Sequence, residues 1–236
     1  RGVHVNMLQS MLAEVYWQYL QENRWKFYNR SQTHGVVNPE DFRTWDMYNL
    51  TQEIKKNYLL SLEGKAILQR PPVADFGLLL TTTDTLQALA TFRPTLFDFI
   101  AHRALAFFKE TDNYSIQPNT TINLNDVRYL KDPFLMPEVL ADSTDKVVTA
   151  LQIYGDILRL HEEGTDPSAY VVALLENMVD RLQKHPNYEV YLANNNTLWK
   201  DIDLSLGYKE NRMALAASLG PNQVRPAAIL TGEGNM

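Results

Sequence analysis

Residues 145–185 read DKVVTALQIYGDILRLHEEGTDPSAYVVALLENMVDRLQKH, and this stretch decides the fold. Its apolar residues recur every three or four positions, as on the buried face of an amphipathic helix. One stripe comprises Val147, Leu151, Tyr154 and Leu158, and the other Val171, Leu174, Leu175, Met178 and Leu182. The pattern predicts two helices, one on each side of residues 163–167.

The link between these helices is five residues long and reads EGTDP at positions 163–167. We expect Gly164 to end the first helix in a left-handed conformation. Asp166 is placed to cap the second helix, and Pro167 suits its first position. A link this short requires antiparallel packing, so the stretch predicts a helical hairpin.

A helix is also expected at the start of the chain. No Gly or Pro interrupts residues 4–34, and apolar and aromatic side chains recur there at helical spacing. They are Leu8, Leu12, Val15, Tyr16 and Tyr19. We expect this helix to end near Asn29, and because the chain opens directly in a helix, we take it as a piece of a longer polypeptide.

Two more helices follow in the sequence. Asn38, Pro39 and the acidic residues after them predict a helix start at residue 38. Its stripe comprises Met47, Leu50, Ile54, Tyr58 and Leu62, and Gly64 closes it. The next helix begins after Pro94, where Thr95 and Asp98 form a weak capping box. Its buried side comprises Leu96, Ile100, Ala104, Phe107 and Phe108.

The remaining segments give weaker patterns. Residues 73–92 fit a short helix or a loop, residues 111–144 resemble a loop with a short strand at 120–124, and 197–206 and 210–219 fit helices. We predict an all-α fold of stacked antiparallel helical hairpins with long loops, a tetratricopeptide-like, degenerate α-solenoid. We expect residues 1–186 to form the helical-repeat-like domain, and residues 187–236 to be a helical continuation with a flexible C-terminal tail.

Composition excludes several classes of function. The 236 residues carry 22 Lys and Arg against 28 Asp and Glu, a net charge of −6. This acidic balance argues against nucleic acid or an anionic membrane as the main partner. The absence of cysteine excludes disulfides, thiolate nucleophiles and zinc–thiolate or iron–sulfur sites. No apolar run approaches the ~20 residues of a membrane-spanning helix, so no membrane insertion is expected.

Catalytic motifs are equally sparse. The five histidines form no His-Glu-x-x-His pattern, and the chain has no nucleophile elbow, phosphate loop or dinucleotide fingerprint. Asp98 and His102 are four residues apart and could orient a general base, which leaves a hydrolase as one alternative. The structural interpretation is a surface pair on one helix. We therefore expect no enzyme, with no catalytic residue, cofactor or metal.

An aromatic and basic cluster occupies residues 24–30. Rings and cations in alternation can stack on nucleobases or sugars, so a glycan-binding helical surface protein is a second alternative. More often such residues close a helix bundle or contact another protein, and any single aromatic residue is more often buried in the core. The candidate protein-interaction residues are Trp25, Phe27, Arg30, Trp45, His102 and Arg103.

Six sequence motifs, taken together, resemble a known protein family. They are SMLAEVYW at 10–17, ENRWKF at 22–27, NRS at 29–31, DFRTWD at 41–46, RPTLFDFIAHRAL at 93–105 and ALQIYGDILRLH at 150–161. In this order, across about residues 7–186, they resemble a helical region of large bacterial alpha-2-macroglobulin-like proteins. Residues 93–105 are the most specific part of the resemblance.

The resemblance implies a tetratricopeptide-like segment that precedes β-sandwich macroglobulin domains in a protein exported to the bacterial cell envelope, periplasmic or outer-membrane-associated. Many such proteins are thought to trap or inhibit proteases, some through a Cys–Gln thioester, which a chain without cysteine cannot form. It implies a non-catalytic scaffold and protein-interaction module in a protease-inhibitor-like protein. Its partners would be other domains of the same parent protein, proteases or envelope proteins.

Overall fold

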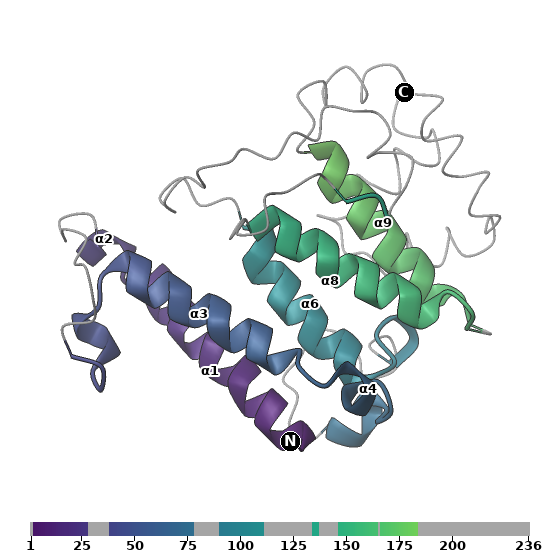
Figure 1. Cartoon of the computed structure of the whole chain (residues 1–236), viewed down its shortest axis with the longest axis horizontal. Coiled ribbons are helices and arrows are strands. Elements are labelled where there is room, and N and C mark those ends of the chain that lie inside the picture. The colour runs from purple at the N-terminus through teal and green to yellow at the C-terminus, as the bar shows by residue number, and fades with distance from the viewer. Residues whose placement is uncertain are drawn as a thin grey trace. The chain divides into compact units, whose positions relative to one another are not determined.

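The structure is a computed structural model, and it describes residues 2–27, 38–77, 90–110, 134–136, 146–164 and 166–183. All the named elements in these ranges are helices, with no strand among them (Figure 1). One isolated β-bridge pairs Pro72 with Thr95. The prediction of an all-α chain is confirmed for this part. The chain divides into two compact units, residues 1–79 with 94–119 and residues 80–93 with 120–236.

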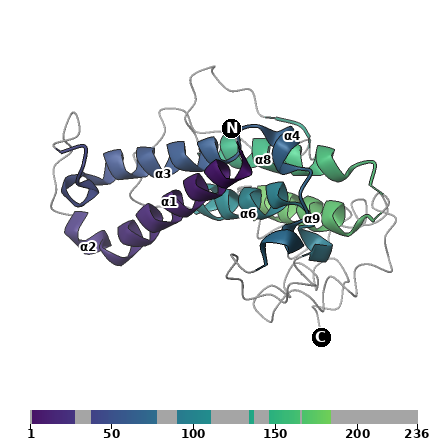
Figure 2. The same ribbon diagram turned by 90° about the horizontal axis from the view of Figure 1, so that it is seen from below.

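The first unit contains α1 (Val3–Glu22), α2 (Arg24–Phe27), η1 (Phe42–Thr44), α3 (Met47–Ser61), α4 (Lys65–Leu68), η2 (Val73–Phe76) and α6 (Leu96–Lys109). Helices α1 and α3 lie side by side in both ribbon views (Figures 1 and 2). They run in opposite directions, because Asn6 bonds the carbonyl of Ser61 whereas Tyr16 contacts Trp45.

Helix α1 ends earlier than the predicted residue 29. The backbone N–H of Asn23 donates to the carbonyl of Tyr19 at 3.1 Å, and its side-chain amide donates to the same oxygen at 2.9 Å. The helix ends at Glu22 with Asn23 as its C-cap, and the side chain of Asn23 adds a second donor to the carbonyl of Tyr19. The short helix α2 follows.

Helix α3 begins later than predicted. Its cap is Asp46, whose carboxylate accepts the backbone N–H of Asn49 at 2.8 Å, so the helix starts at Met47. Asn38 accepts the N–H two residues ahead and forms a turn, and Asp41 caps η1. Three capping side chains thus compete within nine residues, and the predicted start at Asn38 is wrong. The predicted stripe of α3 is buried at Leu50, Ile54, Tyr58 and Leu62.

Helix α6 confirms the predicted capping box. The backbone N–H of Asp98 donates to the hydroxyl of Thr95 at 3.2 Å, and the N–H of Thr95 donates to the carboxylate of Asp98 at 2.9 Å. Most of the helix is buried, whereas Ala106 is exposed and Arg103 and Lys109 are half-buried. Its buried residues include Leu96, Phe97, Phe99, Ile100, Ala104, Leu105, Phe107 and Phe108.

The second unit contains the predicted hairpin, formed by α8 (Lys146–His161) and α9 (Ser168–Gln183). The two helices contact each other along apolar faces and are joined by residues 162–167. The buried side chains include Leu151, Tyr154, Ile157 and Leu158 on α8 and Val171, Ala173, Leu174 and Leu175 on α9. The side chains at 178, 179, 182 and 183 lie outside the described set.

The turn of the hairpin differs from the prediction in one respect. Gly164 is not left-handed; its N–H donates to the carbonyl of His161 at 3.2 Å, and a Cβ there would lie 3.3 Å from that oxygen. Glycine is thus favoured by a close approach rather than by φ. Asp166 accepts the N–H of Ser168 at 2.9 Å, which confirms its capping role.

Several predictions fall on residues that the structure does not describe: the strand at 120–124 and the helices at 197–206 and 210–219. Residues 187–236 lie outside the described ranges as well, so the division at residue 186 stays a prediction. Within the described ranges, none of the helices combines the length and the apolar character needed to cross a membrane.

Candidate functional site

Helix α1 packs against the rest of its unit through its less apolar face. The side chains that it buries are polar or small apart from one leucine: Asn6, Ser10, Ala13 and Leu20. At about 100° of rotation per residue, these positions share one face of the helix. Trp17, half-buried, lies on the same face.

The opposite face of α1 is apolar and exposed. Leu8 is 63% exposed, Met11 52%, Leu12 38% and Val15 53%. We call these four residues the α1 apolar face. Residues 2–13 contain no Asp, Glu, Lys or Arg, so no charged side chain interrupts its N-terminal part. Single exposed apolar residues are common on protein surfaces, whereas a contiguous exposed stripe marks an interaction surface.

Asn6 fixes which face of α1 points inward. Its side-chain amide donates to the carbonyl of Ser61 at 3.0 Å and to that of Glu63 at 2.8 Å. The last carbonyls of a helix have no partner within the helix, so Asn6 satisfies the carbonyl of Ser61 at the end of α3, together with that of Glu63 two residues beyond it. The small side chains of Ser10 and Ala13 allow the two helices to approach closely. Polar satisfaction therefore sets the orientation of α1.

Glu14 connects α1 to α3 and α6. Its carboxylate oxygen Oε2 accepts the hydroxyl of Tyr58 at 2.9 Å and the guanidinium of Arg103 at 3.3 Å. Burial, and then the negative charge of Glu14, raise the pKa of Tyr58 above its ordinary value. The phenol therefore keeps its proton and continues to donate to Glu14.

Glu110, directly after α6, holds the C-terminal end of α1. Its carboxylate accepts the indole N–H of Trp17 at 2.9 Å and the guanidinium of Arg24 at 2.6 Å. The ring of Trp17 lies edge-on to Phe107, with centroids 5.7 Å apart, and Tyr58 stacks on Phe107 at 5.4 Å. These contacts hold α1 at two levels, so its apolar face is presented on a rigid helix.

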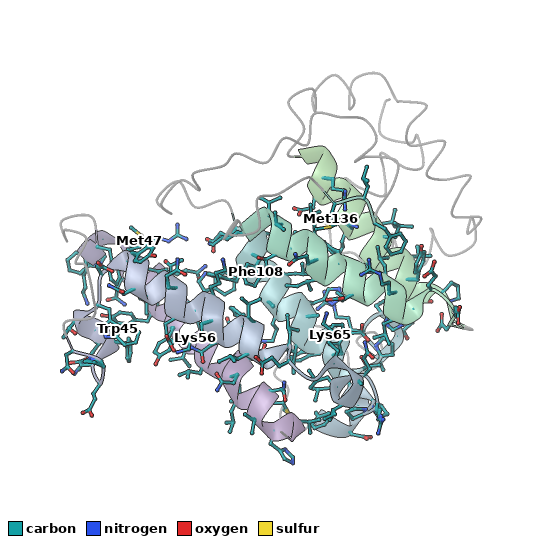
Figure 3. All side chains as sticks on the ribbon, viewed as in Figure 1. Trp45, Met47, Lys56, Lys65, Phe108 and Met136 are labelled. Carbon is teal, nitrogen blue, oxygen red and sulfur yellow. The ribbon has the colours of Figure 1, made fainter. Side chains whose placement is uncertain are left out.

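The aromatic candidates occupy different environments. Trp25 is 67% exposed, with the ammonium of Lys26 5.4 Å from its ring centroid. Phe27 is buried edge-on to Tyr19. Trp45, labelled in Figure 3, is buried before α3, and its indole N–H donates to the carbonyl of Asn38 at 2.7 Å. Phe27 and Trp45 are therefore part of the buried core, and only Trp25 of these three is exposed. The candidate Arg30 lies outside the described residues.

The pair Asp98 and His102 is buried, so its interpretation as a surface pair is wrong. The Asp98 carboxylate accepts both the N–H and the hydroxyl of Thr95, as part of the capping box. The imidazole Nδ1 of His102 lies 2.8 Å from the backbone carbonyl of Asp98. Arg103 contacts Glu14 and lies over the ring of Phe99 at 5.8 Å. These contacts anchor α6 within its unit.

No group of three or more His, Asp or Glu side chains suited to a metal ion occurs in the described ranges. Comparisons of the chain with protein-family models, with curated proteins and with solved structures find no match. The α1 apolar face is the candidate site. Leu8, Leu12 and Val15 stand out in the sequence as an apolar stripe, but the exposure of this stripe was not predicted. Its signal was the periodic series of small and polar residues at 6, 10 and 13, which marks a second packing face on the same helix.

Proposed function

We propose that this chain is a non-catalytic helical scaffold and protein-interaction module. In this proposal its helix pairs are hairpins of a tetratricopeptide-like stack, and the parent is a bacterial alpha-2-macroglobulin-like, protease-inhibitor-like protein of the cell envelope. The observation that carries the interaction role is the exposed α1 apolar face. The six motifs of the resemblance support the family, and the antiparallel pairs α1 with α3 and α8 with α9 support the hairpin arrangement.

The α1 apolar face has the properties of a binding surface. Its centre is apolar and uncharged, and the helix that presents it is held by Asn6, Glu14 and Trp17. A surface that is already ordered loses little conformational entropy when a partner binds, so a small apolar patch can still contribute useful affinity. The partners that we propose are proteins, including other parts of the same parent, proteases and envelope proteins.

Methionine oxidation tests whether this face is covered in the parent protein. Met11 is 52% exposed and should react readily with hydrogen peroxide in the isolated chain at low concentration. In the intact parent protein we expect Met11 to react on the order of tenfold more slowly, because a partner excludes the oxidant. Peptide mass spectrometry measures both rates, and half-buried Met47 on α3 is the internal reference.

Equal rates at Met11 in the isolated chain and the parent would contradict the proposal, provided that Met47 also reacts equally in both. Slower oxidation at both methionines would indicate general shielding and would contradict a role specific to the α1 apolar face. Because the readout is covering of the face, the result does not depend on which protein covers it.

A further inference from the structure

The exposed side of α1 has a coiled-coil spacing along almost its whole length. The positions that alternate by four and three residues are His4, Leu8, Met11, Val15, Gln18 and Glu22, and all six are exposed. This is the spacing of the a and d positions of a heptad. We call these six residues the outer seam. The inward face uses a different set of heptad positions, so α1 can pack on α3 and still offer the outer seam to another helix.

The chemistry of the outer seam is complementary to itself in the antiparallel direction. If a second α1 lies against the first with its direction reversed and the two-fold axis level with residue 13, Met11 of each chain faces Val15 of the other. Leu8 then faces Gln18, and at both ends His4 faces Glu22. Imidazole and carboxylate can form a hydrogen-bonded pair, so the ends are complementary in hydrogen bonding and the centre is apolar.

Two residues beside the outer seam fit the same arrangement. Leu12 of each chain lies next to the axis, where the two side chains extend the apolar centre. Glu14 also flanks the axis, but its carboxylate is turned inward to Tyr58 and Arg103, and the guanidinium offsets its charge. No like charges therefore face each other without a counterion. In a parallel pair, by contrast, Glu22 would face Glu22.

We propose that the outer seam binds the outer seam of a second copy of this chain as an antiparallel, two-fold symmetric helix pair. This rests on the proposed interaction role of α1 and names its partner. A two-fold pair is the commonest closed assembly, and each contact in it occurs twice. Because one helix from each chain contributes, the buried area falls toward the low end of the range for specific interfaces, and we expect a reversible, micromolar dimer.

Sedimentation velocity of the full 236-residue chain over a range of micromolar concentrations tests the dimer. We expect a monomer–dimer equilibrium that Met11→Glu weakens roughly tenfold or more, because it places a carboxylate in both central layers. Leu59→Glu is the matched control, since Leu59 is 41% exposed on α3, away from the outer seam. A monomer at every concentration, or a dimer equally sensitive to both variants, would overturn the proposal.

Crosslinking tests whether the two α1 helices of the dimer run antiparallel. Because the chain has no cysteine, a single introduced cysteine is the only site that reacts. With a short bis-maleimide, Leu12→Cys should give a covalent dimer and Gln18→Cys should not, because only Leu12 lies next to the proposed axis. Efficient crosslinking of Gln18→Cys would indicate a parallel pair and overturn the arrangement. Circular dichroism confirms that each variant is folded. If Met11 is protected in the parent while the isolated chain stays monomeric, this inference fails and the proposed interaction role stands.

Discussion

The two antiparallel helix pairs, α1 with α3 and α8 with α9, are joined by different chemistry. Helices α8 and α9 contact each other and carry buried apolar side chains, such as Leu151 on α8 and Leu175 on α9. Helix α1 instead turns Asn6 and Ser10 toward its unit and leaves Leu8 and Met11 exposed. An apolar stripe therefore identifies a face that needs a partner, but it does not identify the partner. In α1, hydrogen bonds to α3 decide which face is turned inward.

The largest expected effect is on the stability of the apolar pair α8 and α9. Leu151→Ala removes a buried side chain from the hairpin and should lower the free energy of unfolding by about 3 kcal/mol. The matched change on α1, Leu8→Ala, removes an exposed side chain and should change it by less than about 0.5 kcal/mol. Urea denaturation followed by circular dichroism, at concentrations where the chain is monomeric, measures both. Similar losses in the two variants would show that Leu8 is covered within the monomer.

The second prediction concerns the polar pair. Asn6→Ala removes the donor to the carbonyls of Ser61 and Glu63 and should destabilise the chain by about 2 kcal/mol, chiefly because the Ser61 carbonyl lies in a buried position. Gln18→Ala, on the exposed side of the same helix, is the control and should have little effect. The same denaturation measurement applies. A loss below about 0.5 kcal/mol in Asn6→Ala would mean that these bonds do not set the orientation of α1.

The third prediction concerns the hydroxyl of Tyr58, which links α3 to Glu14 on α1. Tyr58→Phe keeps the ring that stacks on Phe107 and removes the hydrogen bond to Glu14, at a cost of about 1 kcal/mol near neutral pH. Burial and Glu14 raise the pKa of Tyr58 above 10.0, so this group contributes stability that is fully present below pH 10.0 and is lost as pH rises further. The wild-type chain should therefore lose stability more steeply than Tyr58→Phe in alkaline solution.

If the free energy of unfolding fell equally with rising alkaline pH in the wild-type chain and in Tyr58→Phe, this role of the Tyr58 hydroxyl would be contradicted. Tyr154, in the hairpin, also has a pKa raised by burial, but it is present in both proteins. The difference between the two curves therefore isolates the contribution of Tyr58.

The smallest expected effect is at the hairpin turn. Asp166→Ala removes the acceptor for the N–H of Ser168 and should cost about 0.5–1 kcal/mol, while Asp166→Asn retains a capping oxygen and most of the stability. The backbone N–H of Ser168 lowers the pKa of Asp166 below 3.8. The capping contribution is thus present above pH 3.8 and is lost as pH falls through the lowered pKa. As the pH falls, the melting temperatures of the wild-type chain and Asp166→Ala should converge. A difference in melting temperature that does not change with pH would contradict the capping role of Asp166.

Local chemistry accounts for what could be predicted of the fold. Asp166 and Thr95 each act on a backbone N–H within three residues, so sequence spacing is enough to identify them. The start of α3 was missed because Asn38, Asp41 and Asp46 are all competent caps, and the choice among them depends on tertiary packing. Local preference cannot separate alternatives of similar free energy.

The candidate site was harder to predict for the same reason. Trp25, Phe27 and Trp45 have similar aromatic and basic neighbours in the sequence, yet Trp25 is exposed and the other two are buried. The exposed apolar face of α1 could not be recognised without Asn6, whose partners lie 55 and 57 positions away. Spacing shows that α1 has two faces, but only long-range hydrogen bonds show which one is open.

The attachment of α1 at Asn6 and at Glu14 has a consequence for how this sequence can vary. Both side chains must reach fixed acceptors or donors on neighbouring helices, and an inserted or deleted residue between them would rotate one attachment by about 100° relative to the other. Substitutions on the solvent side leave both attachments in place. Homologous chains should therefore keep the interval between the two attachments constant.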